Sequence, residues 1–276
     1  PLYSSAASDV YKRQVIDLSL KIAEQYLDME AILKLGGDIV RKSEEGNGRT
    51  FSRPDFSNPA PSGPVKIGIV KDPAFQFYYE ENLEELKNRG AELIEINALT
   101  DSGLPEIDCL YIGGGFPETN AIGLSKNLEF MNSLRLAIEK GLPVYAECGG
   151  MMYLGREIIY NNKAYPMTGI IPLSFVMNDR PVSHGYTLLE VTGPNPFYPQ
   201  GLMIRGHEFH YSRPVSPGDL RFSFTMKRGD GIMNKMDGIC YKNLLATYTH
   251  VHAYGTPEWA EGLIKKAIEY RRLKDA

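Results

Sequence analysis

Hydrophobic residues in the middle of the chain fall into short runs separated by amphipathic stretches. Four mostly apolar runs have the length of buried strands: residues 66–70, 92–96, 108–112 and 143–147. Between them, residues 80–89 and 128–138 repeat apolar positions at helical spacing and are followed by glycines, and Ser125 is the predicted N-cap of the second helix. Strands that alternate with helices predict a parallel sheet covered on both faces.

The pattern changes after Leu154 to alternating apolar and polar positions between turns rich in proline and glycine. Such alternation is typical of antiparallel strands, and it occurs in residues 186–191, 221–224 and 238–241. Residues 244–249 form another predicted strand that leads into His250, and Thr256 and Pro257 begin a final helix. The predicted fold class is therefore α/β, with a parallel-core mixed sheet flanked by helices and antiparallel strands added on one side.

The first 64 residues differ from this domain. Residues 1–14 have no periodicity and no initiating methionine, so we interpret them as a non-native leader. Residues 15–40 contain two short helical patterns, the second capped by Asp28. Residues 41–64 are rich in Ser, Asn, Gly and Pro, which predicts a linker. The main domain is then expected to occupy residues 65–276.

Composition narrows the class of protein. The net charge of −4 offers no basic surface for nucleic acid. No apolar run approaches the ~18 residues of a membrane span. The three cysteines are few, odd in number and widely spaced, which argues against a disulfide framework or a zinc cluster and for the reducing cytoplasm.

One cysteine, Cys148, stands where catalytic nucleophiles often lie. It ends the apolar run 143–147 and is followed by two glycines and a helix-compatible stretch. A strand, a sharp turn and a helix form the nucleophile elbow of many hydrolases, and free N–H groups at the following helix favour the thiolate. The alternative is a buried core thiol, since cysteine often packs as a small hydrophobe.

A cysteine nucleophile needs a base and donors for the oxyanion. His250 follows a predicted strand and would reach the same sheet edge as Cys148. His207 and His210 could suggest a metal site, but the chain offers no further ligands at zinc-like spacing. A hydrogen-bonded pair of Glu208 and His210 that orients a loop is an alternative.

Glycines supply the predicted oxyanion donors. The N–H of Gly149 directly follows the nucleophile, and a second donor would come from Gly114 or Gly115 after the strand at 108–112. A phosphate cradle is the competing interpretation of this glycine triplet. The triplet lacks the Gly-Lys-Ser/Thr ending of a P-loop.

Together these motifs resemble the glutaminase domain of the cobyrinic acid a,c-diamide synthases. The resemblance covers residues 15–258 and is carried by Gly113–Glu118, Tyr145–Gly150, Gly206–Ser212 and Tyr248–His252, with support from Asp72–Tyr79 and Glu81-Asn82-Leu83. It implies a flavodoxin-like class I glutamine amidotransferase fold in which Cys148 takes the glutamine acyl group and His250 assists. Many class I relatives carry a glutamate two residues after that histidine. Here His252 occupies the position, so His252 and, as a weak candidate, Glu208 are the residues considered for the third catalytic or orienting role.

The resemblance also implies a larger enzyme. Full-length relatives carry an N-terminal synthetase domain that uses ATP and Mg, and residues 15–40 resemble its helical tail. The expected partners are glutamine, that ammonia-accepting synthetase domain and a tetrapyrrole, with no nucleic acid, membrane, metal or resident cofactor in this chain. The sequence leaves a homodimer open.

The tetrapyrrole and its contacts stay open. Stacking on a flat macrocycle is one interpretation of the aromatic group Phe75, Phe77, Tyr78 and Tyr79, and core packing is the other. Cobyrinate or hydrogenobyrinate is the first expected substrate. Residues 195–199 and 256–259 resemble the branch that amidates sirohydrochlorin, and a nickel-sirohydrochlorin enzyme is a further relative. A peptidase-type cysteine hydrolase and a non-catalytic binding module are the alternatives of other classes.

Overall fold

The computed structural model describes residues 63–275, together with Lys21, Asp28, Glu30, Ala31 and Lys34. The chain divides into two units, residues 1–57 and 58–276. In the first unit, the Asp28 side chain accepts a hydrogen bond of 2.9 Å from the Ala31 N–H, as predicted for an N-cap. The predicted leader at 1–14, most of 15–40 and nearly all of the linker at 41–64 lie outside the described residues.

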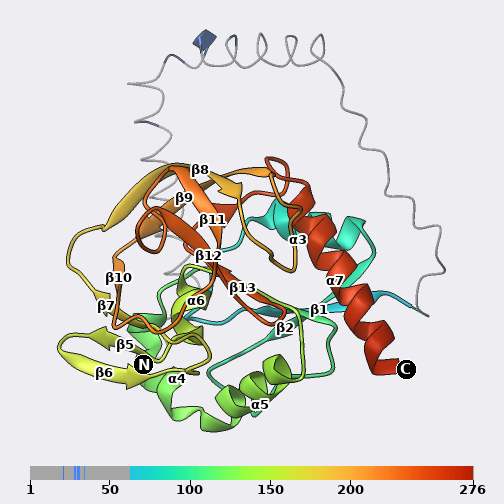
Figure 1. Cartoon of the computed structure of the whole chain (residues 1–276), viewed down its shortest axis with the longest axis horizontal. Helices are drawn as coiled ribbons and strands as arrows, with labels where there is room; N and C mark the ends of the chain where they lie inside the picture. The colour runs from blue at the N-terminus through green and yellow to red at the C-terminus, as the bar shows by residue number, and fades with distance from the viewer. Residues whose placement is uncertain (1–20, 22–27, 29, 32–33, 35–62, 276) are drawn as a thin grey trace. The chain divides into compact units, whose positions relative to one another are not determined.

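The second unit is built on a ten-stranded sheet (Figure 1), with the order β14-β9-β8-β11-β12-β13-β4-β3-β1-β2. One half of this sheet is parallel, as predicted. Its strands are β1 (Val65–Val70), β2 (Ala91–Ile96), β3 (Cys109–Ile112), β4 (Val144–Glu147) and β13 (Leu244–Thr247). The carboxyl ends of these strands meet at one edge, where ligands bind in open α/β sheets.

The other half is antiparallel and extends one side of the sheet, which confirms the predicted addition. It consists of β8 (Ser183–Val191), β9 (Met203–His210), β11 (Phe222–Arg228), β12 (Met236–Tyr241) and β14 (His250–Val251). The strand predicted at 244–249 was too long. It ends at Thr247, and His250 belongs to β14, where it pairs with His207 of β9.

A second, four-stranded sheet was not predicted. It has the order β10-β7-β5-β6 and contains β5 (Glu157–Tyr160), β6 (Lys163–Pro166), β7 (Ser174–Met177) and β10 (Ser212–Val215). These strands have four residues each, so their alternation is too brief to stand out in the sequence.

Helices cover both faces of the parallel strands (Figure 1). Successive side chains of a strand point to opposite faces, so Tyr111 and Tyr145 pack beneath α3 (Glu80–Asn88) and α7 (Glu258–Asp275). Ile112 and Ala146 pack on the other face, which is covered by α4 (Ala121–Lys126), α5 (Leu128–Glu139) and α6 (Gly149–Leu154). No helix among the described residues is long and apolar enough to cross a membrane.

The predicted cap of α5 was wrong. Ser125 lies inside α4, where its hydroxyl donates to the Ile122 carbonyl. Asn127 is the N-cap, and its side chain accepts a hydrogen bond of 3.3 Å from the Phe130 N–H. Asn127 also donates to the carbonyls of Ala98 and Asp101, so contacts distant in sequence fix this helix start.

Candidate active site

Cys148 forms the sharp turn between β4 and α6, as the elbow prediction required. Its φ of 47° lies in the left-handed region, which costs energy for any residue other than glycine. The turn also needs Gly150, because a Cβ there would lie 2.4 Å from the Ile112 carbonyl oxygen. Cys148 is 6% exposed. The positive φ of Cys148 and the close packing of Gly150 therefore place this thiol at the carboxyl edge of the sheet.

His250 meets Cys148 at that edge. The imidazole is buried between aromatic neighbours: the Phe77 ring centroid lies 4.7 Å away, and the His207 ring stacks at 5.0 Å. Burial lowers the pKa of His250, but the neighbouring Cys148 and Glu147 side chains together outweigh burial and raise that pKa to about 10. This environment favours an imidazolium beside the sulfur atom.

The carboxylate beside His250 is Glu147, which sequence reasoning missed. Its Oε2 lies 3.1 Å from His250 Nδ1. The side chain is 1% exposed. A carboxylate at the end of the otherwise apolar strand β4 was the signal that could have found it, since buried acids are rarely unpaired.

The two residues proposed from the sequence as third catalytic residues have other partners. Glu208 accepts hydrogen bonds from the backbone N–H groups of Asp230 and Gly231, and its Oε2 lies 3.5 Å from His210. His252 is partly exposed and faces Glu81 at 3.7 Å. Glu208 and His210 thus lie close together, but His210 Nε2 makes no hydrogen bond within the described part of the chain, so the predicted hydrogen-bonded pair does not form.

The glycine triplet packs against the base and the nucleophile. A Cβ at Gly114 would lie 2.6 Å from His250 Cε1, and the Gly114 N–H donates to the Phe77 carbonyl at 3.2 Å. Gly115 has a φ of 153°, and a Cβ on Gly149 would touch its backbone at 3.1 Å. Because the Gly114 N–H already donates to Phe77, Gly115 and Gly149 are left as the candidate oxyanion donors.

Two of the four aromatic residues suggested for a macrocycle are unsuited to it. Phe75 is fully buried and packs on Tyr153 at 5.5 Å, so core packing is the correct interpretation. Tyr78 hydrogen-bonds the Val70 carbonyl and accepts from the Gly113 N–H, so it braces the glycine triplet. Phe77 is 41% exposed.

The other two histidines of the motif do not converge on one ion. His207 binds the Tyr79 hydroxyl through Nδ1 at 2.8 Å and stacks on His250. Burial, followed by the charge of His250, lowers the pKa of His207 to about 4. His210 instead stacks on Tyr248, with ring centroids 3.6 Å apart. Among the described residues, no three His, Cys, Asp or Glu side chains are grouped to hold a metal ion.

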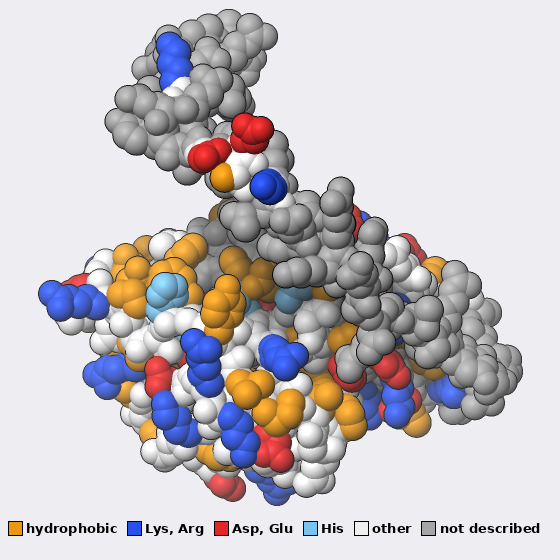
Figure 2. All heavy atoms as spheres, turned by 90° about the horizontal axis from the view of Figure 1, so that it is seen from above, with side chains coloured by type: hydrophobic (Ala, Val, Ile, Leu, Met, Phe, Trp, Pro, Cys, Tyr) orange, Lys and Arg blue, Asp and Glu red, His pale blue; other side chains and the backbone are white. Residues whose placement is uncertain are grey.

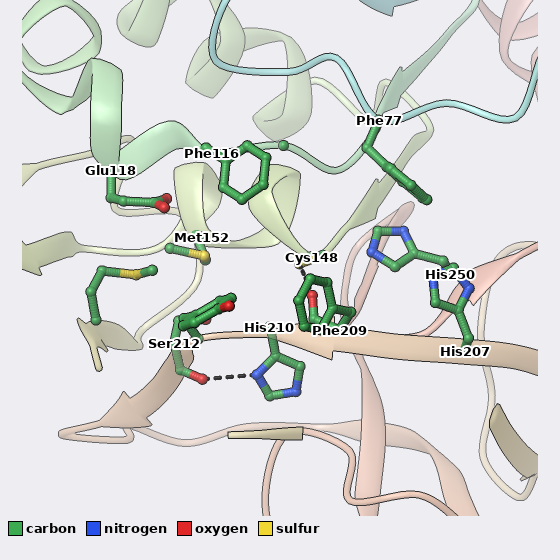
Figure 3. Close-up of a pocket in the computed structure, with 13 residues that line it drawn as sticks. Phe77, Phe116, Glu118, Cys148, Met152, His207, Phe209, His210, Ser212 and His250 are labelled. Carbon is green, nitrogen blue, oxygen red and sulfur yellow. Dashed lines mark hydrogen bonds between the residues drawn. The ribbon is translucent and has the colours of Figure 1, made fainter. Parts of the chain in front are cut away.

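A pocket opens directly over Cys148. Figure 3 shows Glu118 on the far side of this pocket from His250, with Cys148 between them. Burial raises the pKa of the Glu118 carboxyl, so a cation bound beside it would favour its charged form. The pocket walls also include the exposed aromatic rings of Phe116 and Phe209. Figure 2 shows hydrophobic side chains beside histidines on the surface. The pocket leaves space for a small molecule beside the Cys148 sulfur.

Comparison with known proteins agrees with this geometry. The CobB/CobQ-like glutamine amidotransferase domain matches residues 66–257. The chain belongs to this family. The match includes the elbow at Cys148, the glycine triplet and His250, and it confirms the family resemblance seen in the sequence.

Similar curated proteins carry the name cobyrinate a,c-diamide synthase. The Archaeoglobus fulgidus protein is 38% identical over 262 residues, which are 93% of this chain and 54% of that protein. The Magnetococcus marinus protein is 36% identical over 249 residues, or 89% of this chain and 52% of that protein. The chain spans about half the length of the curated relatives it matches.

Solved structures show the same fold at low identity. A PurLQS structure from Thermotoga maritima aligns with a TM-score of 0.57 and 16% identity over 75% of this chain and 99% of that chain. A structure described as a glutamine amidotransferase aligns with a TM-score of 0.53 and 21% identity, covering 73% and 98% of the two chains. These likenesses confirm the class I glutamine amidotransferase fold predicted from the sequence.

Proposed function

We propose that this chain hydrolyses glutamine through a covalent Cys148 intermediate and passes the ammonia to a tetrapyrrole-amidating synthetase. The single observation that carries the proposal is the meeting of a strained, turn-borne thiol with His250 at the edge of the sheet. Membership in the CobB/CobQ-like family supplies the acyl donor, glutamine.

In the first half-reaction, the Cys148 sulfur attacks the side-chain amide carbon of glutamine. The carbonyl oxygen becomes an oxyanion, which the N–H groups of Gly115 and Gly149 would stabilise. His250, as imidazolium, gives its proton to the amide nitrogen. The carbon–nitrogen bond then breaks, ammonia leaves and a thioester to Cys148 remains.

In the second half-reaction, the now neutral His250 takes a proton from water. The resulting hydroxide attacks the thioester carbonyl, and a second oxyanion forms in the same place. Its collapse breaks the carbon–sulfur bond and releases the side-chain carboxylic acid, which loses its proton to solvent and becomes glutamate. Cys148 is left as thiolate and His250 as imidazolium, as at the start.

Glu118 fits the recognition of the amino acid head group. Among the described residues that line the pocket, it supplies the one carboxylate. Its position across the pocket from His250 suits the α-ammonium group of a glutamine whose amide lies at Cys148. Pairing with that cation would offset the burial that raises the Glu118 pKa.

The relatives' name extends the proposal to the whole enzyme. In that enzyme, a synthetase half would use ATP and Mg to activate the acetate side chains of cobyrinate or a similar tetrapyrrole, and ammonia from this chain would amidate them. The exposed Phe77, Phe116 and Phe209 at the pocket mouth suit burial against such a half.

The test is glutamate release from glutamine by the purified chain. We expect turnover that Cys148→Ala abolishes, with an unchanged melting temperature. Turnover that persists in this variant would disprove the proposal. Cleavage of peptides by the parent, without glutamate release, would instead favour a peptidase-type hydrolase.

A further inference from the structure

To act as a base, His250 needs a partner that holds its ring and sets the position of its proton. The structure assigns this role to Glu147, the residue directly before the nucleophile, and we infer that it is the positioning carboxylate of the site. The inference rests on the proposed function, since it concerns the same base.

Hydrogen bonds fix both oxygens of Glu147. Oε2 accepts from the Tyr111 hydroxyl at 3.1 Å and faces His250 Nδ1 at the same distance. Oε1 accepts from the Val251 N–H at 3.3 Å. The carboxylate is thus held by donors from β3 and β14, and its remaining contact goes to the imidazole. A buried group held in this way cannot swing away from the ring.

Strand geometry explains how neighbouring residues serve the same base. Glu147 continues the β4 face that carries Tyr145 and so points toward Tyr111, which is the register partner of Tyr145 on β3. Cys148 leaves the strand through its positive φ and lines the pocket together with His250. The imidazole thus has Glu147 at its Nδ1 and shares the pocket wall with the thiol.

This arrangement fixes the useful tautomer of His250. The carboxylate accepts a hydrogen bond from Nδ1–H, so neutral His250 has its lone pair on Nε2, free to take a proton. The negative charge of Glu147 also stabilises the imidazolium form. Position 252, two residues after the base, holds a histidine that faces Glu81 at 3.7 Å. Glu147 therefore takes over the role that a glutamate at that position would have.

The test compares substitutions of Glu147 in the purified chain. Glu147→Gln keeps the side-chain volume but removes the charge, and we expect glutamine turnover to fall by about 10²–10⁴-fold. Glu147→Asp keeps the charge on a shorter side chain and should recover part of this loss. Asp108→Asn is the matched control, because Asp108 is also a buried carboxylate in an ion pair but lies at the other end of β3. It should keep the parental kcat even where it lowers the melting temperature.

A second measurement separates positioning from a merely structural role. NMR titration of labelled histidine should show the His250 pKa falling by about 1–3 units in Glu147→Gln, with the parental value retained in Asp108→Asn. Parental turnover in Glu147→Gln, or a lost turnover with an unmoved His250 pKa, would overturn the inference. If Cys148→Ala still releases glutamate, the proposed function itself fails, which is a distinguishable result.

Discussion

A single methyl group placed on Gly114 should displace His250, the proposed catalytic base. The Cβ of an alanine at this position would lie 2.6 Å from His250 Cε1, whereas ordinary contact begins near 3.4 Å. The imidazole would have to move by about 0.8 Å. Phe77 and His207 pack on the ring, and Glu147 holds its Nδ1, so the displacement must disturb at least one of these contacts.

The expected magnitude follows from the sensitivity of catalysis to geometry. A misplacement of about 1 Å costs on the order of 10²-fold in rate. We therefore expect Gly114→Ala to lower kcat for glutamine hydrolysis by about this factor, with little change in KM because the pocket keeps Glu118. Gly114 has an ordinary φ, so alanine brings no backbone strain of its own.

Steady-state release of glutamate measures the effect, with Gly255→Ala as the matched control. A Cβ on Gly255 would have its nearest contact at 3.5 Å, and activity should stay at the parental level. Circular dichroism melts would confirm that both variants fold. A folded Gly114→Ala enzyme with parental kcat would refute the placement of His250 as the base.

Three further outcomes follow from the structure. Glu118→Gln should raise the KM for glutamine about tenfold or more while kcat changes little, because it removes the charged partner of the α-ammonium group; an unchanged KM would exclude this contact. Phe75→Ala should lower the free energy of unfolding by about 3–5 kcal/mol in urea titrations, whereas Phe77→Ala should cost far less, and equal losses would contradict the burial assigned to Phe75. The pKa of His207 is about 4 in the folded chain and has its ordinary value of 6.5 in the unfolded chain. The unfolded chain therefore takes up a proton at higher pH, and the free energy of unfolding falls as pH decreases from 6.5 toward 4. Melts at pH 7 and pH 5 should show this loss reduced in His207→Gln, and an undiminished loss would contradict the assignment.

The parallel half of the fold could be predicted because β1, β3, β4 and β13 are buried along almost their whole length, on both faces. Such strands are continuous apolar runs, and the helices between them end at glycines. The four-stranded sheet was missed because strands of four residues barely show a period. The Ser125 cap was wrong because Asn127 is selected by contacts with Ala98 and Asp101, which are distant in sequence.

The turn at Cys148 could be predicted because its pattern is local, whereas contacts that depend on folding were missed. The elbow at Cys148 is formed by consecutive residues, so its pattern can be recognised in the sequence. The partner of His250 lies 103 positions earlier. The residues considered from the sequence were His252 and Glu208, but strand pairing brings Glu147 to the imidazole. Phe75 and Phe77 likewise look equivalent in sequence, yet one is buried and the other exposed.

Covalent labelling tests the central claim most directly. A chloroketone analogue of glutamine should inactivate the chain with one adduct, and peptide mass spectrometry should place that adduct on Cys148. Excess glutamine should slow the labelling, and Cys240→Ala should be labelled like the parent because this cysteine lies outside the pocket. An adduct on another residue, or labelling that glutamine does not slow, would contradict the assignment of Cys148 as the glutamine-hydrolysing nucleophile.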